Sequence, residues 1–91
     1  MEKLQYNIVV YGRVQGVWFR KYTKEKADEL GVYGIVENFP DRSVFISAEG
    51  TKDKLEIFMD WLYKGSPLSR VQEIVWDTGE VYGYKDFTVK H

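Results

Sequence analysis

The sequence predicts an α+β domain in which two helices lie on one face of a mostly antiparallel sheet. Three observations lead to this fold class. Strand-like and helix-like apolar patterns follow one another along the 91 residues in the order strand, helix, strand, strand, helix, strand. Aromatic residues make up 16% of the chain, which lets a short chain build a dense core. The chain has no cysteine, so no disulfide framework can substitute for that core.

The N-terminal third predicts a strand, a loop and a helix. Residues 5–11 are rich in β-branched and aromatic side chains and predict a strand that Gly12 ends. Residues 12–17 contain two glycines and no helical period, which indicates a loop. A helix is expected from residue 18 or 19 to Leu30, followed by Gly31 at the left-handed cap position. Its buried face contains Phe19, Thr23, Ala27 and Leu30.

A hairpin and a second helix follow. Strands over residues 32–39 and 44–49 flank the turn sequence Pro40-Asp41-Arg42-Ser43. Gly50-Thr51 opens the second helix with Thr51 as its N-cap, and Gly65-Ser66-Pro67 stops it. In the second strand of the hairpin, one face carries Val44, Ile46 and Ala48, and the other carries Phe45, Ser47 and Glu49. The apolar stripe of the helix contains Leu55, Phe58, Met59 and Leu62, widened by Ile57 and Trp61.

Strands over residues 71–78 and 87–89 complete the chain, which we expect to form a single domain over residues 1–91. The order β-α-β-β-α-β plus a short C-terminal strand, with right-handed crossovers, favours a ferredoxin-like two-layer sandwich. The first and third strands are then adjacent and central. The first and second strands run in the same direction, so their C-terminal ends share one edge of the sheet. The loop over residues 12–17 and the segment Asn38–Phe39 should therefore lie together.

Composition and charge exclude several function classes. The net charge is −1 and the isoelectric point about 5.8, without the positive excess that a nucleic-acid-binding protein uses. The only histidine is the last residue, His91, and cysteine is absent, so neither a catalytic triad nor a His/Cys metal cluster is expected. No apolar run approaches the roughly 20 residues of a membrane span, and the N-terminus does not resemble a signal peptide. These features predict a cytoplasmic protein.

The loop before the first helix is a candidate anion site. Backbone N–H groups of such a loop can point inward, and the positive end of the helix adds to them. Gly16 lets the backbone approach a ligand, and Arg20 in the first helical turn can place a planar guanidinium against two phosphate oxygens. A cation at a helix N-terminus is mildly unfavourable for stability, which favours a functional role. A tight turn followed by a solvated arginine is the alternative that these residues leave open.

Asn38 at the end of the second strand also has two interpretations. Asparagine is disfavoured in strands and favoured in turns, so Asn38 can simply open the turn that follows. Its amide can instead orient a water molecule, since it has both a donor and an acceptor. Asp41 is expected to hydrogen-bond within its turn, and Arg13 is either a solvated loop charge or an attractor of anions.

Two sequence motifs resemble the acylphosphatase family. Residues 10–20, VYGRVQGVWFR, match the first signature of that family, V-x-G-x-V-Q-G-V-x-[FYW]-R, at every defined position. Residues 34–50 are similar to the second signature, G-[FYW]-[AVC]-x-N-x₃-G-x-V-x₅-G. The resemblance continues through Gly65-Ser66-Pro67 and Tyr84-x-x-Phe87-x-Val89 and so covers nearly the whole chain. Ile35 replaces a usual aromatic residue, and Arg42 replaces the turn glycine, where a positive φ would strain an arginine.

The resemblance implies an acylphosphatase that hydrolyses acyl phosphates to a carboxylate and inorganic phosphate by attack of water on phosphorus. Arg20 and Asn38 are then the catalytic residues, with Arg20 holding the phosphate and Asn38 positioning the water. No metal or other cofactor is implied. The expected partners are small-molecule acyl phosphates, with no nucleic acid and no membrane, and the expected state is a monomer. The implied phosphate-binding residues, acting mainly through main-chain N–H groups, are Gln15, Gly16, Val17, Trp18, Phe19 and Arg20.

Four questions remain open from the sequence. RNA-recognition domains share the element order, and Tyr11 and Phe45 could be their exposed aromatic residues, although the low isoelectric point disfavours this. A regulatory or maturation-type domain could keep the fold without useful turnover, although intact Arg20 and Asn38 favour an enzyme. Trp18 either rests on apolar surface or lines the mouth of the site and contacts the acyl group. The physiological acyl phosphate is not specified.

Overall fold

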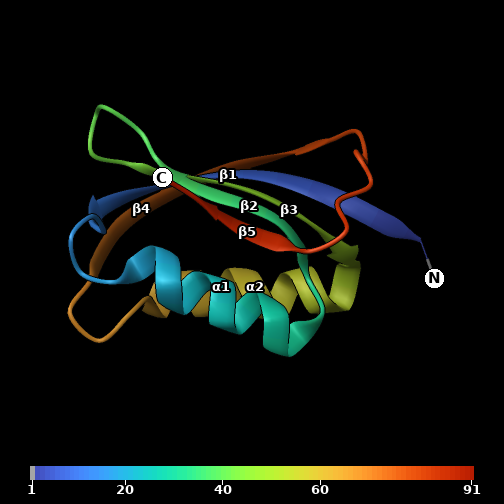
Figure 1. The fold of residues 1–91 in the computed structure, drawn as a ribbon, viewed down its shortest axis with the longest axis horizontal. Coiled ribbons are helices and arrows are strands. Elements are labelled where there is room, and N and C mark those ends of the chain that lie inside the picture. Colours follow the sequence, from blue (N-terminus) through green and yellow to red (C-terminus); the bar gives the residue numbers. More distant parts are fainter. Residues whose placement is uncertain (1) are drawn as a thin grey trace.

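A computed structural model describes residues 2–91, and within this range it contains one five-stranded sheet with two helices on one face (Figure 1). The strand order is β4-β1-β3-β2-β5, and β2 pairs with β5 in parallel while the other neighbours are antiparallel. The predicted ferredoxin-like α+β fold is therefore confirmed, with β1 and β3 adjacent. The elements are β1 Lys3–Arg13, α1 Phe19–Leu30, β2 Tyr33–Asn38, β3 Val44–Thr51, α2 Lys52–Lys64, β4 Arg70–Gly79 and β5 Phe87–Lys90.

The sequence predicted that Gly12 ends the first strand, and this prediction was wrong. The strand continues to Arg13, and its pairing with β4 shifts register between Tyr11 and Gly12. Gly12 has a φ of 133°, and a Cβ built on it would lie 2.2 Å from the carbonyl oxygen of Arg70. Only glycine permits so close an approach of two backbones. Gly12 thus marks a bulge inside β1, and the connecting loop spans residues 14–18.

The core fills the space between the helices and the sheet. The stripe of α2 is buried as predicted, and Phe58 packs edge-on against Phe87 of β5 with ring centroids 6.1 Å apart. Ile57 is 50% exposed, so the prediction that it widens this stripe was wrong. Thr51 occupies the N-cap position as predicted, but its hydroxyl donates to the Asp53 carboxylate instead of accepting a backbone N–H. No helix within residues 2–91 is long and apolar enough to cross a membrane.

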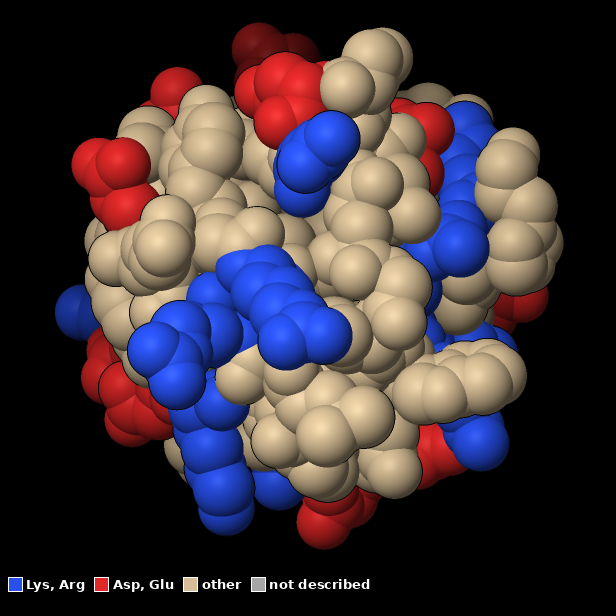
Figure 2. All heavy atoms as spheres, turned by 90° about the vertical axis from the view of Figure 1, so that its left-hand side faces the viewer, with Lys and Arg blue, Asp and Glu red and all other residues tan. Residues whose placement is uncertain are grey.

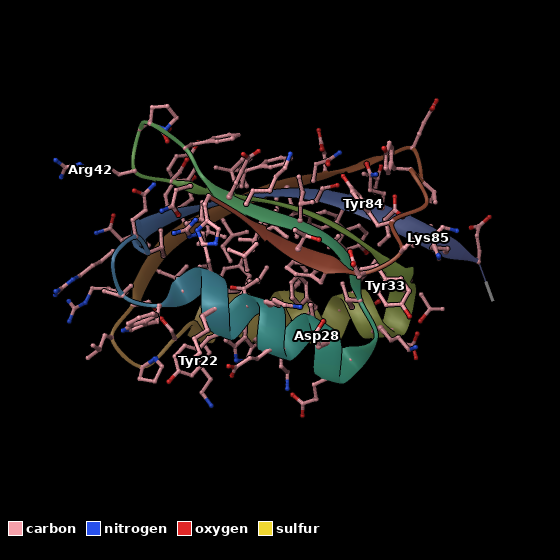
Figure 3. The ribbon with its side chains drawn as sticks, viewed as in Figure 1. Tyr22, Asp28, Tyr33, Arg42, Tyr84 and Lys85 are labelled. Carbon is pink, nitrogen blue, oxygen red and sulfur yellow. The ribbon has the colours of Figure 1, made fainter. Side chains whose placement is uncertain are left out.

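Glu49 of β3 is fully buried on the sheet face opposite the helices. The connection from β4 to β5 runs over this end of the sheet, where Tyr84 is labelled (Figure 3). The Glu49 carboxylate accepts hydrogen bonds from the backbone N–H groups of Tyr82, Gly83 and Tyr84 and from the side-chain amide of Gln5. Burial alone would raise the pKa of Glu49, but these hydrogen bonds outweigh it and hold the pKa below its ordinary value.

We expect the Glu49→Gln variant to lose about 2 kcal/mol of unfolding free energy at pH 7, because the backbone N–H groups that bind Glu49 lose their charged acceptor. A lowered pKa in the folded state means that this stability is present above the ordinary glutamate pKa and decreases as the pH falls below it. Denaturant unfolding at pH 7 and in acid should therefore show a difference between wild type and variant that shrinks in acid. Glu25→Gln, at an exposed helix position, is the matched control. A difference that stays the same at both pH values would contradict this account.

Candidate active site

The loop between β1 and α1 leaves the first turn of α1 without a side-chain cap. Trp18 occupies the N-cap position in the left-handed region, with a φ of 63°, and makes no capping hydrogen bond through its side chain. The first turn also contains no acidic residue. The first N–H groups of a helix have no intrahelical partner, and the helix dipole gives this end a partial positive charge. The start of α1 can therefore receive an anion.

The backbone of this loop is strained in a way that shapes the site. Gly16 has a φ of 73°, which glycine adopts freely, but the same region costs about 1–3 kcal/mol for a bulky residue such as Trp18. A Cβ built on Gly16 meets no atom within 4 Å, so the space in front of this residue is open. The indole of Trp18 is 68% exposed. The loop thus combines an accessible backbone with an outward-facing aromatic ring.

Contacts with two other segments hold the loop in place. The side-chain amide of Gln15 donates to the carbonyl oxygens of Phe39 and Ser43, each at 2.9 Å. On the other side, the Ser66 hydroxyl donates to the carbonyl oxygen of buried Val17 at 3.0 Å. These contacts tie the loop to the β2–β3 hairpin and to the segment after α2. The expectation that the loop and the end of β2 lie together is confirmed.

A cleft of about 500 Å³ opens between this loop, β2 and β5. Of the site residues that the sequence predicted, the cleft lining includes Gly16, Trp18, Phe19, Arg20 and Asn38. Gln15 and Val17 do not line it, because the Gln15 side chain is turned to the hairpin and Val17 is buried. The complete lining is Val14, Gly16, Trp18, Phe19, Arg20, Lys21, Asn38, Val89 and His91.

Arg20 is held by the last strand. Its Nη1 atom donates to the carbonyl oxygen of Lys90 at 2.7 Å, which fixes one side of the guanidinium and leaves other N–H groups for a ligand. Among residues 2–91, no carboxylate forms an ion pair with Arg20. The cleft lining contains no aspartate or glutamate. On this end of the molecule, lysine and arginine atoms lie across the middle and most acidic atoms lie toward the rim (Figure 2). The cleft is therefore electropositive.

Asn38 carries an unused acceptor. Its Oδ1 atom is buried, and no group within residues 2–91 donates a hydrogen bond to it. A buried acceptor without a partner costs about 1–3 kcal/mol, so such atoms usually bind water or a ligand. Asn38 as a residue also lines the cleft, so this unpartnered acceptor belongs to a side chain at the cleft wall.

Arg42, which stands where the family signature has a turn glycine, has a positive φ. Its φ is 77°, its N–H donates to the Phe39 carbonyl at 3.1 Å, and Phe39 in turn donates to Ser43 at 2.9 Å. The side chain extends away from the body of the molecule and is not part of the cleft lining (Figure 3). Asp41 accepts from the backbone N–H and hydroxyl of Ser43, which lowers the pKa of Asp41. Arg42 thus preserves a positive φ at the cost of backbone strain.

Lys21 and His91 were not among the site residues that the sequence predicted. His91 was excluded because it is the last residue, yet it lines the cleft. The parallel pairing of β5 with β2 explains its position. Lys90 lies opposite Glu37, and the residues that follow these two are His91 and Asn38, so both come at the same end of the strand pair. The short apolar pattern at residues 87–89 gave no information about which strand β5 would join.

Comparisons with known proteins identify the family. The profile of the family described as Acylphosphatase matches residues 6–89. The acylphosphatase of Mannheimia succiniciproducens is 44% identical over 89 residues, covering 97% of this chain and 99% of the relative. That of Thermus thermophilus is 46% identical over 81 residues, covering 89% and 92%. The crystal structure of acylphosphatase from Bacillus subtilis superposes with a TM-score of 0.94 at 38% identity, covering 97% of this chain and 99% of that one.

The chain therefore belongs to the acylphosphatase family. Its enzymatic function is the hydrolysis of acyl phosphates, which is the reaction of this family. The same fold also occurs inside a much longer protein. The crystal structure of full-length HypF in the phosphate- and nucleotide-bound form superposes with a TM-score of 0.89 at 29% identity, covering 99% of this chain and 12% of that one.

Proposed function

We propose that the cleft beside α1 is the catalytic site of this acylphosphatase. The backbone N–H groups of residues 15–20 and the Arg20 guanidinium bind the phosphate, and Asn38 orients the attacking water. The observation that carries this assignment is that Asn38, whose Oδ1 atom has no hydrogen-bond partner within residues 2–91, lines the same cleft as Arg20. Neither the fold nor the hairpin turn uses that atom.

Phosphate binding follows from the geometry of the loop. The open space in front of Gly16 and the uncapped start of α1 present N–H donors to one region. The tether from Arg20 to the Lys90 carbonyl orients the guanidinium before the substrate arrives, which reduces the entropy lost on binding. Gln15 acts through its backbone N–H, while its side chain holds the loop against the hairpin.

The reaction is direct attack of water on phosphorus. The bond from the water oxygen to phosphorus forms as the bond from phosphorus to the acyl oxygen breaks, and its electron pair leaves with the carboxylate. The water proton passes to a phosphate oxygen. A carboxylic acid has a pKa of about 4, so the leaving group needs no general acid. Positioning and charge stabilisation then supply most of the catalysis, as is usual for loose phosphoryl-transfer transition states.

This mechanism assigns charge stabilisation to Arg20 and the N–H groups, so it requires no metal ion. We also infer that residues 1–91 act as one domain, as a monomer in the cytoplasm, on small-molecule acyl phosphates and not on nucleic acid. The net charge of −1 supports the exclusion of nucleic acid, which a positive field would attract. The likeness to part of HypF raises a regulatory domain as the alternative, and measurable turnover distinguishes the two.

Hydrolysis of benzoyl phosphate in ¹⁸O-labelled water, with a chelator present, tests the reaction. We expect the ultraviolet absorbance of benzoyl phosphate to fall and the label to appear in inorganic phosphate. Label in benzoate would mean attack on the carbonyl carbon and would contradict the mechanism. Activity that disappears in chelator and returns with a divalent metal would contradict the metal-free assignment.

A further inference from the structure

The cleft has one more cation and more N–H donors than its phosphate-binding groups account for. Besides Arg20, its lining includes Lys21 and His91, and no acidic side chain lines it. Lys21 forms no ion pair within residues 2–91, where the three close pairs all involve other lysines. The site proposed above uses neither Lys21 nor His91. Both are therefore free to contact another part of a ligand.

These two residues come from different segments that border the cleft. Lys21 follows Arg20 on α1, and its ammonium group lies 5.7 Å from the ring centroid of Trp18. His91 directly follows β5, whose last residue Lys90 pairs with Glu37, the residue before Asn38 on β2. Both His91 protonation states present at least one N–H donor, and lysine presents three. The cleft thus provides N–H donors beyond the reacting phosphate.

The remaining lining indicates where the acyl group lies. Trp18 and Val89 give the cleft apolar surface, and a volume of about 500 Å³ falls in the range of pockets that hold whole small molecules. An acyl group beside Trp18 would bring any anionic substituent it carries toward Lys21 or His91. A positive cleft also attracts anions electrostatically, more strongly as the ligand charge increases.

We propose that Lys21 and His91 form an acyl subsite that selects acyl phosphates whose acyl group carries a second oxyanion, a carboxylate or a phosphate. Trp18 supplies the apolar wall of this subsite. The inference rests on the catalytic assignment of the cleft and adds the substrate class to it. It also assigns Trp18 to the mouth of the site, one of the two positions that the sequence allowed.

Two substrates of matched shape test this subsite: benzoyl phosphate and 4-carboxybenzoyl phosphate. The readout is the ratio of their kcat/KM values, because loss of positive charge can weaken phosphate attraction for both. We expect wild type to favour the carboxylated substrate. The double variant Lys21→Gln/His91→Gln should lower the ratio by about tenfold, because one charge contact and one hydrogen bond at exposed positions are lost together. Lys85→Gln, at the other end of the molecule (Figure 3), should leave the ratio unchanged.

The outcomes separate this inference from the proposed function. If wild type hydrolyses neither substrate, the catalytic assignment fails. If it hydrolyses both but the double variant keeps the wild-type ratio while remaining folded by circular dichroism, the subsite is overturned. An equal loss for both substrates also overturns it, since the two residues would then serve the phosphate or the fold. A third substrate with a phosphonate in place of the carboxylate identifies which oxyanion fits better.

Discussion

The Arg20→Ala variant is expected to lose about a thousandfold in kcat/KM for acyl phosphates while remaining folded. Charged hydrogen bonds to phosphate strengthen as negative charge spreads over its oxygens in the transition state. Arginines in such positions contribute roughly 10³-fold or more to phosphoryl transfer. The stability cost is small because the side chain is partly exposed and its one hydrogen bond, to Lys90, is at the surface. Steady-state kinetics with benzoyl phosphate and thermal unfolding measure the two effects.

Two further arginine variants sharpen this test. Arg20→Lys keeps the charge but loses the planar fork, so we expect about a hundredfold loss. Arg13→Ala removes an exposed positive charge at the end of β1, outside the cleft lining. This variant should change kcat/KM by less than about threefold. If Arg20→Ala stays within tenfold of wild type, or loses no more than Arg13→Ala, Arg20 is a solvated surface residue instead of a phosphate ligand.

The Asn38→Ala variant is expected to lose about a hundredfold in kcat with little change in KM. The phosphate ligands remain in place, but the water loses the acceptor that orients it. The unfolding free energy should stay the same or rise slightly, because the substitution removes a buried acceptor that has no partner in residues 2–91. If Asn38 only stabilised the turn, Asn38→Ala would keep its kcat and lose unfolding free energy.

Asn38→Asp is the matched control for this prediction. It preserves the shape of the side chain but directs a negative charge into the cleft, so both kcat and phosphate affinity should decrease. Kinetics and denaturant unfolding of both variants give the comparison. An Asn38→Ala variant that keeps its kcat but loses about 2 kcal/mol of stability would show that Asn38 only opens the hairpin turn.

The element order and the position of the site could be predicted because both depend on local patterns. The helix spanning residues 19–30 ends at Gly31, whose φ of 75° matches the cap that its position indicated. Parallel directions of the first two strands were enough to place Asn38 beside the loop. Topology therefore placed the loop and Asn38 together, whereas the roles of Arg20 and Asn38 came from the resemblance to the family signatures and stay predictions.

Long-range contacts explain what the sequence could not show. Gly12 was expected to end a strand, but a glycine is needed there because the backbone of Arg70 in β4 lies too close for a Cβ. Glu49 was expected only on the face opposite Ile46, yet it is buried because backbone N–H groups more than 30 residues later bind it. His91 reaches the cleft because β5 pairs with β2 in parallel. A pattern within one element contains no information about such partners.

The central claim is that the start of α1, Arg20 and Asn38 bind phosphate together. Titration of ¹⁵N-labelled protein with inorganic phosphate, followed by amide chemical shifts, tests it most directly. We predict saturable shifts confined to the backbone N–H groups of residues 15–20 and the Asn38 side-chain amide, and their loss in Arg20→Ala. No shift at millimolar phosphate, or shifts centred elsewhere on the molecule, would contradict the assignment of this cleft.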